Sequence, residues 1–395
     1  MESAETGQRV FEPDSGVEWP ALLLKESALH HNAEVMAQYC REHEVSLAPH
    51  GKTHVSPELW QLQEAAGAWG VSVASPGQAR VFREAGARRI LMANQLVDAA
   101  FARWAQREIS SDEDFEFFCY VDSVAGVRLL EEALEPGPAL PVVIEIGHDG
   151  GRAGCRDSAT VQAVAEAVAA SDHLALVGVA GYEGSVSHAR DAQALDAVRD
   201  YLRGVTAQFQ SLAAAGLLAA TAAEYLLTAG GSLYFDLVAE VFGQVRYLDR
   251  PVRTVLRSGA YLTHDHGLYG RLSPLGVSGP AAFTAAGEVW AQVLSIPEPG
   301  LVLLNAGRRD VPYDQGLPIA LGYRRGGSFH RLEGTEVLEL NDHHTFLRTP
   351  AGQEPAVGEL VAPGTSHPCT LHDKWSRALL VDDQYRVVGA IHSHF

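Results

Sequence analysis

A short stretch near the amino end of the chain combines side chains that could do chemistry. In "SLAPHGKTHVSP" (residues 46–57), His50, Lys52 and His54 alternate at the end of an apolar run. Residues spaced by two share one face of an extended chain, so we expect these three side chains to point to the same side. Burial and neighbouring cations lower the pKa of a lysine from its ordinary value near about 10.4 and allow it to form a Schiff base. The alternative interpretation is a surface lysine beside two loop histidines.

Two glycine-containing motifs each follow an apolar run later in the chain. They are "TAGGS" (228–232) and "SGAY" (258–261). Glycines let backbone N–H groups approach a phosphate closely, although each motif alone is also typical of a tight turn. Together with Lys52 they indicate a phosphorylated aldehyde cofactor, because one site binds phosphate and another can form an imine.

Two further motifs offer side chains that could contact such a cofactor. The glycine-rich segment "EIGHDGGRAGC" (145–155) carries Arg152, whose guanidinium stays protonated and could sit on a pyridine nitrogen or a carboxylate. The segment "AGYEG" (180–184) carries Tyr182, an aromatic ring with a hydroxyl. Its alternative interpretation is a tyrosine whose hydroxyl is merely satisfied by a hydrogen bond.

A histidine and a cysteine near the carboxyl end have the spacing of a metal-binding pair. In "SHPCTLHDKW" (366–375), one residue separates His367 from Cys369, so on an extended strand both side chains lie on one face. Imidazole and thiolate together prefer zinc. Two ligands are too few for a structural zinc site, so they fit a catalytic ion that leaves positions to water and substrate, or the pair is incidental.

Eight short apolar runs alternate with segments of helical periodicity over residues 45–258. This pattern predicts a parallel (β/α)8 barrel. The alternative is an open doubly wound sheet, but no G-x-G-x-x-G follows the first strand. Barrel enzymes carry their reactive groups at the carboxyl ends of the strands, where Lys52 and the glycine motifs lie. The predicted strands span residues 45–49, 70–74, 89–93, 116–121, 141–146, 175–180, 224–228 and 253–258.

After residue 271 the sequence changes to short alternating runs separated by Gly, Pro and Asp turns, which predict an all-β domain. We expect the segment before Glu26 to pair with these strands. The predicted domains are therefore a barrel over residues 26–270 and a β domain over 271–395, together with 1–25. The fold class is α/β, with the metal pair carried by the β domain.

The bulk composition excludes several classes of function. The chain of 395 residues has 30 Lys and Arg against 49 Asp and Glu, a formal charge of -19, and lacks basic clusters, so no nucleic acid partner is expected. No apolar run approaches the roughly 18 residues that would suit a membrane helix, and the first residues do not resemble an export signal. Four scattered cysteines suit reduced thiols in a cytoplasm. We therefore expect a cytoplasmic protein without a membrane partner.

In chain order, the motifs resemble a known family. "PHGKTH", "AGAWGVSVASPGQA", "EIGHDGGRAG", "GYEG", "AGGS" and "SHPC" followed by "DKW" are similar to those of D-serine dehydratases and D-threonine aldolases. These are fold-type III pyridoxal phosphate enzymes related to alanine racemase. The resemblance covers residues 20–395, and its wording is most similar to the bacterial "amino acid deaminase" branch. It implies a barrel that carries pyridoxal 5'-phosphate (PLP), a metal pair in the β domain and a homodimer.

The resemblance also implies roles for individual residues. Lys52 resembles the Schiff-base lysine, and His367 and Cys369 match a pair that holds zinc (Zn2+) or another divalent cation. This chain has Ala180 where many relatives have glutamine, so an amide hydrogen bond from that position is not expected here. The remaining positions that match cofactor contacts are Arg152 and Tyr182, and those that match the phosphate loops are Thr228, Gly230, Gly231, Ser258 and Gly259.

The resemblance finally implies a reaction. Dehydratases of the family carry His-x-Cys and aldolases His-x-Asp, so Cys369 favours elimination. The expected enzyme is a PLP- and zinc-dependent ammonia-lyase that converts a small 3-hydroxy D-amino acid to a 2-oxo acid and ammonia. Lys52 takes the α-proton, and the ion held by His367 and Cys369 activates the β-hydroxyl. The alternatives are retro-aldol cleavage to glycine and an aldehyde, a racemase, or a non-catalytic PLP-binding protein.

Overall fold

The computed structural model describes residues 6–395, which form two compact units. The first, called the barrel unit here, contains residues 37–52 and 63–259. The second, called the β unit, contains the described residues up to Met36, the short segment Thr53–Leu62, and Ala260–Phe395. Lys52 is therefore the last residue of a barrel segment, and the residues that follow it pack with the β unit. The domain boundaries expected from the sequence stay a prediction.

The barrel unit is built on one sheet of eight parallel strands. Their order in the sheet is β2-β9-β8-β7-β6-β5-β4-β3. The two end strands approach each other through a parallel bridge between His50 and Ser72 and a hydrogen bond from Trp69 N to Leu47 O of 2.7 Å, so the barrel is nearly closed. This confirms the predicted barrel. The strands are β2 (Ser46–Leu47), β3 (Val71–Val73), β4 (Arg89–Gln95), β5 (Glu116–Val121), β6 (Leu140–Ile146), β7 (Leu174–Gly181), β8 (Tyr225–Ala229) and β9 (Val252–Leu256).

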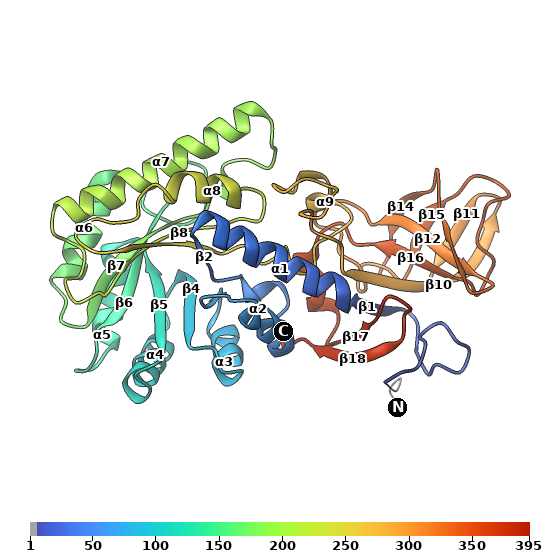
Figure 1. Cartoon of the computed structure of the whole chain (residues 1–395), viewed down its shortest axis with the longest axis horizontal. Helices are drawn as coiled ribbons and strands as arrows, with labels where there is room; N and C mark the ends of the chain where they lie inside the picture. Colours follow the sequence, from blue (N-terminus) through green and yellow to red (C-terminus); the bar gives the residue numbers. More distant parts are fainter. Residues whose placement is uncertain (1–5) are drawn as a thin grey trace. The chain divides into compact units, whose positions relative to one another are not determined.

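Helices connect these strands and lie outside them (Figure 1). Several begin at a Ser or Asp whose side chain accepts a hydrogen bond from the first turn, as Ser75 does from Gln78 N and Asp191 from Ala194 N. Because Ser and Asp mark the starts of these helices, the boundaries between strands and helices could be predicted from the sequence. The connecting helices are α2 (Pro57–Ala65), α3 (Pro76–Glu84), α4 (Ala99–Ser111), α5 (Val124–Ala133), α6 (Ser158–Ala169), α7 (Ala192–Ala214) and α8 (Phe235–Phe242), whereas α1 (Glu26–His43) begins in the β unit and precedes β2.

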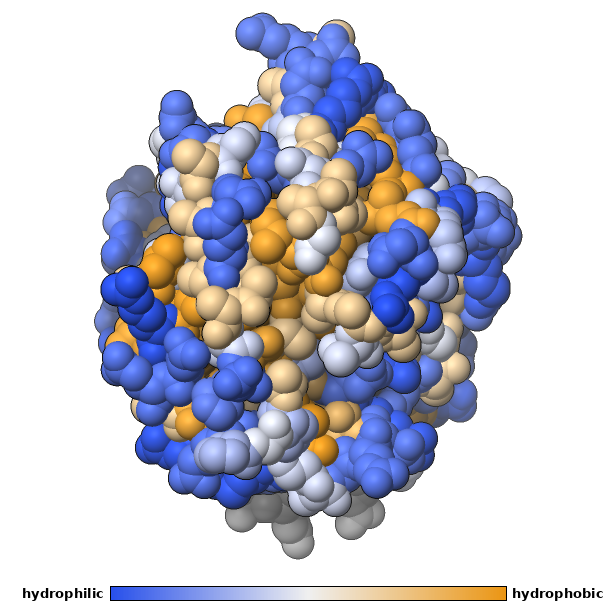
Figure 2. Space-filling view, turned by 90° about the vertical axis from the view of Figure 1, so that its left-hand side faces the viewer, coloured by the Kyte–Doolittle hydropathy of each residue, from blue (hydrophilic) through white to orange (hydrophobic). Residues whose placement is uncertain are grey.

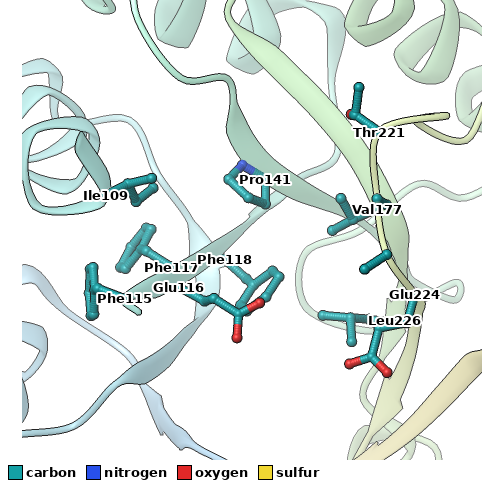
Figure 3. Close-up of a pocket in the computed structure, with 12 residues that line it drawn as sticks. Ile109, Phe115, Glu116, Phe117, Phe118, Pro141, Val177, Thr221, Glu224 and Leu226 are labelled. Atoms are coloured by element: carbon teal, nitrogen blue, oxygen red, sulfur yellow. The ribbon is translucent and has the colours of Figure 1, made fainter. Parts of the chain in front are cut away.

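The amino end of the barrel contains a hollow of about 230 Å³ between β5 and β8 (Figure 3). Aromatic and aliphatic side chains such as Phe118 and Leu226 line it. Trp69 lies nearby, with the guanidinium of Arg89 5.5 Å from its ring and that of Arg253 5.7 Å from it. Figure 2 looks at the left-hand side of Figure 1 and shows hydrophobic residues near the middle of that face, inside a hydrophilic rim. The predicted site residues follow the opposite, carboxyl ends of the strands.

The β unit is built on a sheet with the order β13-β12-β16-β10-β1-β17-β18, to which β11, β14 and β15 are added through β10. Strand β1 pairs antiparallel with β10 and parallel with β17, which confirms for residues 21–25 the expected pairing with these strands. The strands are β1 (Ala21–Lys25), β10 (Gly287–Glu298), β11 (Leu301–Leu304), β12 (Ile319–Arg325), β13 (Ser328–Arg331), β14 (Glu336–Leu340), β15 (Thr345–Arg348), β16 (Leu360–Gly364), β17 (Arg377–Val381) and β18 (Val387–His392).

Helical structure in the later part of the β unit is limited to α9 (Leu268–Leu272) and two short 3-10 turns, Pro368–Thr370 and His372–Lys374. The core of the sheet gathers around Trp290, which is fully buried. Among residues 6–395, no helix combines the length with the apolar character that crossing a bilayer requires.

A glycine on β7 allows two barrel strands to approach each other. A Cβ at Gly178 would lie 2.0 Å from Leu226 O of β8, whereas a Cβ at Gly204 in α7 would meet no atom within 4 Å. We expect Gly178→Ala to lower the free energy of unfolding by about 1–3 kcal/mol, because the strands must separate. Gly204→Ala is the matched control and should raise it by about 0.5–1 kcal/mol. Urea unfolding measures both, and equal midpoints for the two variants would contradict this packing.

Candidate active site

Lys52 lies in a 3-10 helix, Gly51–Thr53, that begins shortly after β2 ends. This turn interrupts the extended chain, so the expectation that His50, Lys52 and His54 share one face is wrong. Lys52 is exposed and His54 is 1 % exposed, and His54 already packs with the β unit. A Cβ at Gly51 would lie 2.4 Å from the ring of Phe82. A close approach that only glycine permits therefore fixes the backbone just before the lysine.

The chain has three lysines, and two of them are engaged away from the ends of the barrel strands. Lys25 forms an ion pair with Glu288 of β10, and Lys374 lies 3.7 Å from Asp373 in the β unit. Only Lys52 follows a barrel strand. It is therefore the amine in this chain that can serve the barrel.

The lowered pKa of His50 reflects the positive charges at the carboxyl end of the barrel. Burial, together with the cations of Lys52, Arg257 and Arg152, holds the pKa of His50 well below its usual range. Its Nδ1 atom is buried and has no hydrogen-bond partner among the residues that the structure describes. A neutral imidazole surrounded by three cations marks a local positive potential, despite the negative charge of the whole chain.

The loops after β8 and β9 contact each other, as the phosphate-site hypothesis requires. Ser258 Oγ donates a hydrogen bond to Gly231 O at 3.3 Å, and Gly230 has φ +158°. A Cβ at Gly230 would lie 2.4 Å from Arg257 N. Gly259 follows Ser258 directly in the chain. The structure thus brings the predicted glycines and Ser258 together, and their roles toward a phosphate stay a prediction.

Arg257 is a residue that sequence reasoning missed. It is 3 % exposed, and its guanidinium donates to Thr228 Oγ1 at 2.8 Å and to Gly181 O at 2.7 Å. Thr228 Oγ1 in turn donates to Val255 O at 2.8 Å, so this hydroxyl supports the arginine. The signal was present, because Arg257 stands directly after the apolar run of β9 and before "SGAY". A buried arginine needs polar partners, and this one ties β7, β8 and β9 together.

Arg152 and Tyr182 lie together. The Arg152 guanidinium lies 4.6 Å from the centre of the Tyr182 ring. Tyr201 of α7 joins the loops that carry them, because its hydroxyl donates to Ile146 O at 2.6 Å and accepts from Tyr182 N at 3.0 Å. The long helix α7 therefore sets the spacing between the ends of β6 and β7.

Glu183 is a second residue that the sequence analysis quoted without assigning a role. It is fully buried, and its Oε1 accepts a hydrogen bond from Gly231 N, which links the loops after β7 and β8. Burial raises the pKa of Glu183 against the effect of its backbone hydrogen bonds. Its Oε2 atom and the hydroxyl of buried Tyr120 have no hydrogen-bond partner among the described residues.

These residues fit a phosphorylated, aromatic aldehyde such as PLP. Cations and glycine backbone suit its phosphate, the exposed amine of Lys52 suits its aldehyde, and buried polar atoms at His50 and Tyr120 remain to be satisfied. Buried polar groups are normally hydrogen-bonded, so unsatisfied ones at the end of a barrel indicate a polar ligand.

His367 and Cys369 form a contacting pair in the β unit. His367 Nδ1 lies 2.7 Å from Asp314 Oδ2, and Thr370 Oγ1 donates to the other oxygen of Asp314 at 2.7 Å. Burial lowers the pKa of His367, but its hydrogen bond to Cys369 and the nearby Asp314 outweigh that effect and raise the pKa to about 9. A carboxylate behind a histidine is the arrangement that orients metal-binding imidazoles.

The pair fits an ion with two protein ligands. Within residues 6–395, no three His, Cys, Asp or Glu side chains lie close enough together to hold a metal. Two soft ligands would leave the remaining positions of a zinc ion to water and substrate, as a catalytic site requires.

The segment "THDHGLY" (263–269) packs beside this pair. His266 N donates to Thr365 O and Leu268 N donates to Ser366 O, both at 3.0 Å. The ring of Tyr269 lies 5.9 Å from that of His367. The segment therefore supports the backbone that carries His367.

Within the β unit, the chain next to Lys52 contacts the chain next to the metal pair. His54 comes two residues after Lys52, and His372 comes three residues after Cys369. Their rings are 6.3 Å apart in an edge-to-face arrangement, and both are 1 % exposed. The segment that follows Lys52 and the segment that follows Cys369 are thus in contact within the β unit through buried histidines.

Two family models match successive parts of the chain. A family model described as "Alanine racemase, N-terminal domain" matches residues 24–263, more than half of the chain. A second, described as "Putative serine dehydratase domain", matches residues 286–381.

Individual relatives include both reaction types. The chain is 28% identical over 368 residues to a D-threonine aldolase of an Arthrobacter species, covering 90% of this chain and 87% of the relative. It is 31% identical over 242 residues to the D-threo-3-hydroxyaspartate dehydratase of a Delftia species, covering 57% and 63%. The solved D-threonine aldolase from Filomicrobium marinum has a TM-score of 0.81 at 26% identity and covers 99% of this chain and 98% of that one.

Three histidines of the β unit should make the protein sensitive to acid. Burial lowers the pKa of His264 and His266 to about 4 and that of His372 to about 3. Unfolded histidines titrate near about 6.5, so the unfolded chain takes up protons between pH 7 and pH 5 that the folded protein does not. Stability therefore falls as the pH falls, by up to about 1.4 kcal/mol per pH unit for each histidine.

Urea unfolding at pH 7, 6 and 5 checks this expectation. His372→Gln should make the loss of unfolding free energy with falling pH shallower, whereas His30→Gln, at an exposed position of α1, should leave the slope unchanged. An identical slope in wild type and His372→Gln would show that His372 is not held neutral by the fold.

Proposed function

Because this chain belongs to the family of D-serine dehydratases and D-threonine aldolases, with the barrel of alanine racemase, we propose that it is a PLP- and metal-dependent dehydratase. Its substrate is a small 3-hydroxy D-amino acid, and its products are a 2-oxo acid and ammonia. The observation that carries the proposal is the contacting His367–Cys369 pair with Asp314 behind the histidine, which is a donor set suited to zinc.

Residues of the barrel unit would hold the coenzyme and move the α-proton. PLP supplies an electron sink for the carbanion at Cα of the amino acid. The exposed Lys52 amine would hold the coenzyme and then act as the general base on the α-proton.

Residues of the β unit would assist the departure of the β-hydroxyl. His367 and Cys369 would hold a divalent cation, which acts as a Lewis acid on the leaving hydroxyl. Asp314 orients His367 through its Nδ1, and Thr370 fixes Asp314.

An aldolase is the second candidate, and a specific observation favours it. Relatives that match about nine-tenths of this chain include the Arthrobacter D-threonine aldolase and a 3-hydroxy-D-aspartate aldolase of Paracoccus denitrificans, at 28% and 26% identity. The same metal pair would hold the β-hydroxyl in that reaction, but the bond from Cα to Cβ would break. The expected homodimer and cytoplasmic location are part of the proposal in either case.

Products from D-threonine distinguish the two reactions. The dehydratase proposal predicts 2-oxobutanoate and ammonia, with L-threonine as the matched control that should react poorly. A chelator should abolish the activity, and zinc should restore it. Glycine and acetaldehyde as the main products would overturn the proposal in favour of the aldolase.

The coenzyme lysine can be identified directly, because the chain has only three lysines. Borohydride reduction of the PLP-loaded protein should place the coenzyme on the peptide that contains Lys52, as peptide mass mapping would show. Lys52→Ala should lose the visible absorbance of bound PLP, whereas Lys374→Ala should keep it. Coenzyme on Lys25 or Lys374 in the wild-type protein would refute the assignment.

A further inference from the structure

We propose that residues 392–394, which are the last residue of β18 and the two that follow it, form a clamp that sets the position of Lys52, with His392 and the backbone of His394 as its positioning groups. This inference rests on the proposed function, because positioning Lys52 matters for activity only if Lys52 holds the coenzyme. The clamp acts on residues 53–58, called the lysine loop here. All of its contacts lie within the β unit, and Lys52 is joined to the loop by one peptide bond.

The lysine loop contains a strained residue. Val55 has φ +42° and is 1 % exposed. A β-branched residue in the left-handed region is a genuine outlier, and such a conformation persists only where the surrounding structure holds it. Val55 stands three residues after Lys52, so the conformation at Val55 sets the direction in which the chain leaves the lysine.

The clamp makes the contact that holds this conformation. His394 N donates a hydrogen bond to Val55 O at 2.9 Å. The donor is itself well anchored, because β18 pairs with β17 up to His392 and Ser393 N donates to Ser376 O at 3.1 Å. The strained carbonyl is therefore bonded to a backbone group that a sheet keeps in place.

A second contact fastens the other end of the loop. His392 Nδ1 lies 2.9 Å from Glu58 Oε1, and Glu58 Oε2 accepts from Ser56 Oγ at 2.9 Å. Ser56 N donates to His54 Nδ1 at 3.0 Å. A continuous chain of hydrogen bonds thus runs from His392 through Glu58 and Ser56 to the residue two positions after Lys52.

The clamp also follows directly from the segment of the metal pair. His372, whose ring contacts His54, precedes β17, and β17 is the strand to which the clamp is anchored. The lysine loop is therefore held by two contacts from the same part of the β unit. His372 contacts His54, and residues 392–394 bond to Val55 and Glu58. Releasing the clamp would let Val55 return to a right-handed conformation and would move Lys52.

Two substitutions at one exposed position separate the backbone contact from the side chain. His394→Pro removes the N–H that bonds Val55 O, whereas His394→Ala keeps it. The side chain of His394 is exposed, so the alanine variant is the matched control. We expect His394→Pro to raise the Kd for PLP about tenfold, the upper range for one hydrogen bond, and to reduce borohydride trapping at Lys52. His394→Ala should match wild type in both measurements.

A rescue experiment distinguishes positioning from general stability. Glycine adopts a positive φ without a Cβ penalty, so Val55→Gly added to His394→Pro should recover much of the PLP affinity, and Val55→Ala added to it should not. His392→Ala is the second test if His394→Pro does not fold, and it should raise the Kd in the same direction by a smaller factor.

The outcomes separate this inference from the proposed function. A wild-type protein that does not trap PLP on Lys52 would refute the proposed function. A wild-type protein that does trap it, beside a His394→Pro variant with a lower urea midpoint but unchanged Kd and unchanged trapping, would show that the segment is merely structural and would overturn the clamp.

Discussion

The site depends on the turn of the chain between β2 and α2, where Lys52 is presented from a backbone that is fixed on both sides. Before the lysine, Gly51 lies so close to Phe82 that a side chain would displace the ring. After it, the chain passes through the left-handed Val55 and reaches α2. A lysine has a long, flexible side chain, so its amine can be placed reproducibly only if its backbone is held in this way. The two constraints come from different units, because Gly51 packs within the barrel unit and Val55 within the β unit.

The electrostatics of the barrel oppose those of the whole protein. The chain carries a formal charge of -19, yet Lys52, Arg152 and Arg257 act together on His50. Concentrating cations at one end of a barrel creates a local field that draws in a small anion, while the negative surface elsewhere repels polyanions. The β unit offers complementary chemistry, because His367 and Cys369 form a pair that could hold a cation, with Asp314 behind the histidine. One unit thus suits an anionic coenzyme and the other a metal ion.

The barrel strands and several features of the site could be predicted from the sequence, because they depend on residues that are close together in the chain. The eight apolar runs fell on the eight barrel strands, since apolar periodicity and Ser, Asp and Gly punctuation survive folding. The loops with the glycine motifs meet, as their places after neighbouring strands indicated. His367 and Cys369 also contact each other, although Cys369 lies in a 3-10 turn and not on the expected extended strand.

What could not be predicted depends on contacts between residues far apart in the chain. The shared face of His50, Lys52 and His54 failed because a 3-10 turn follows β2, and the alternation rule holds only while a strand continues. Arg257 was missed because its importance lies in partners on β7 and β8. Asp314 and the clamp at residues 392–394 have no motif of their own, and only the fold brings them to His367 and to Val55.

The central claim is that Lys52 and the metal pair act on different bonds of one substrate. The most direct test follows a 3-hydroxy D-amino acid in deuterated water by proton NMR, with the PLP-loaded protein before and after removal of the metal. The account predicts that the metal-free protein still exchanges the α-proton for deuterium but releases no 2-oxo acid, and that zinc restores release. Elimination at an undiminished rate without metal, or loss of α-proton exchange together with elimination, would contradict it.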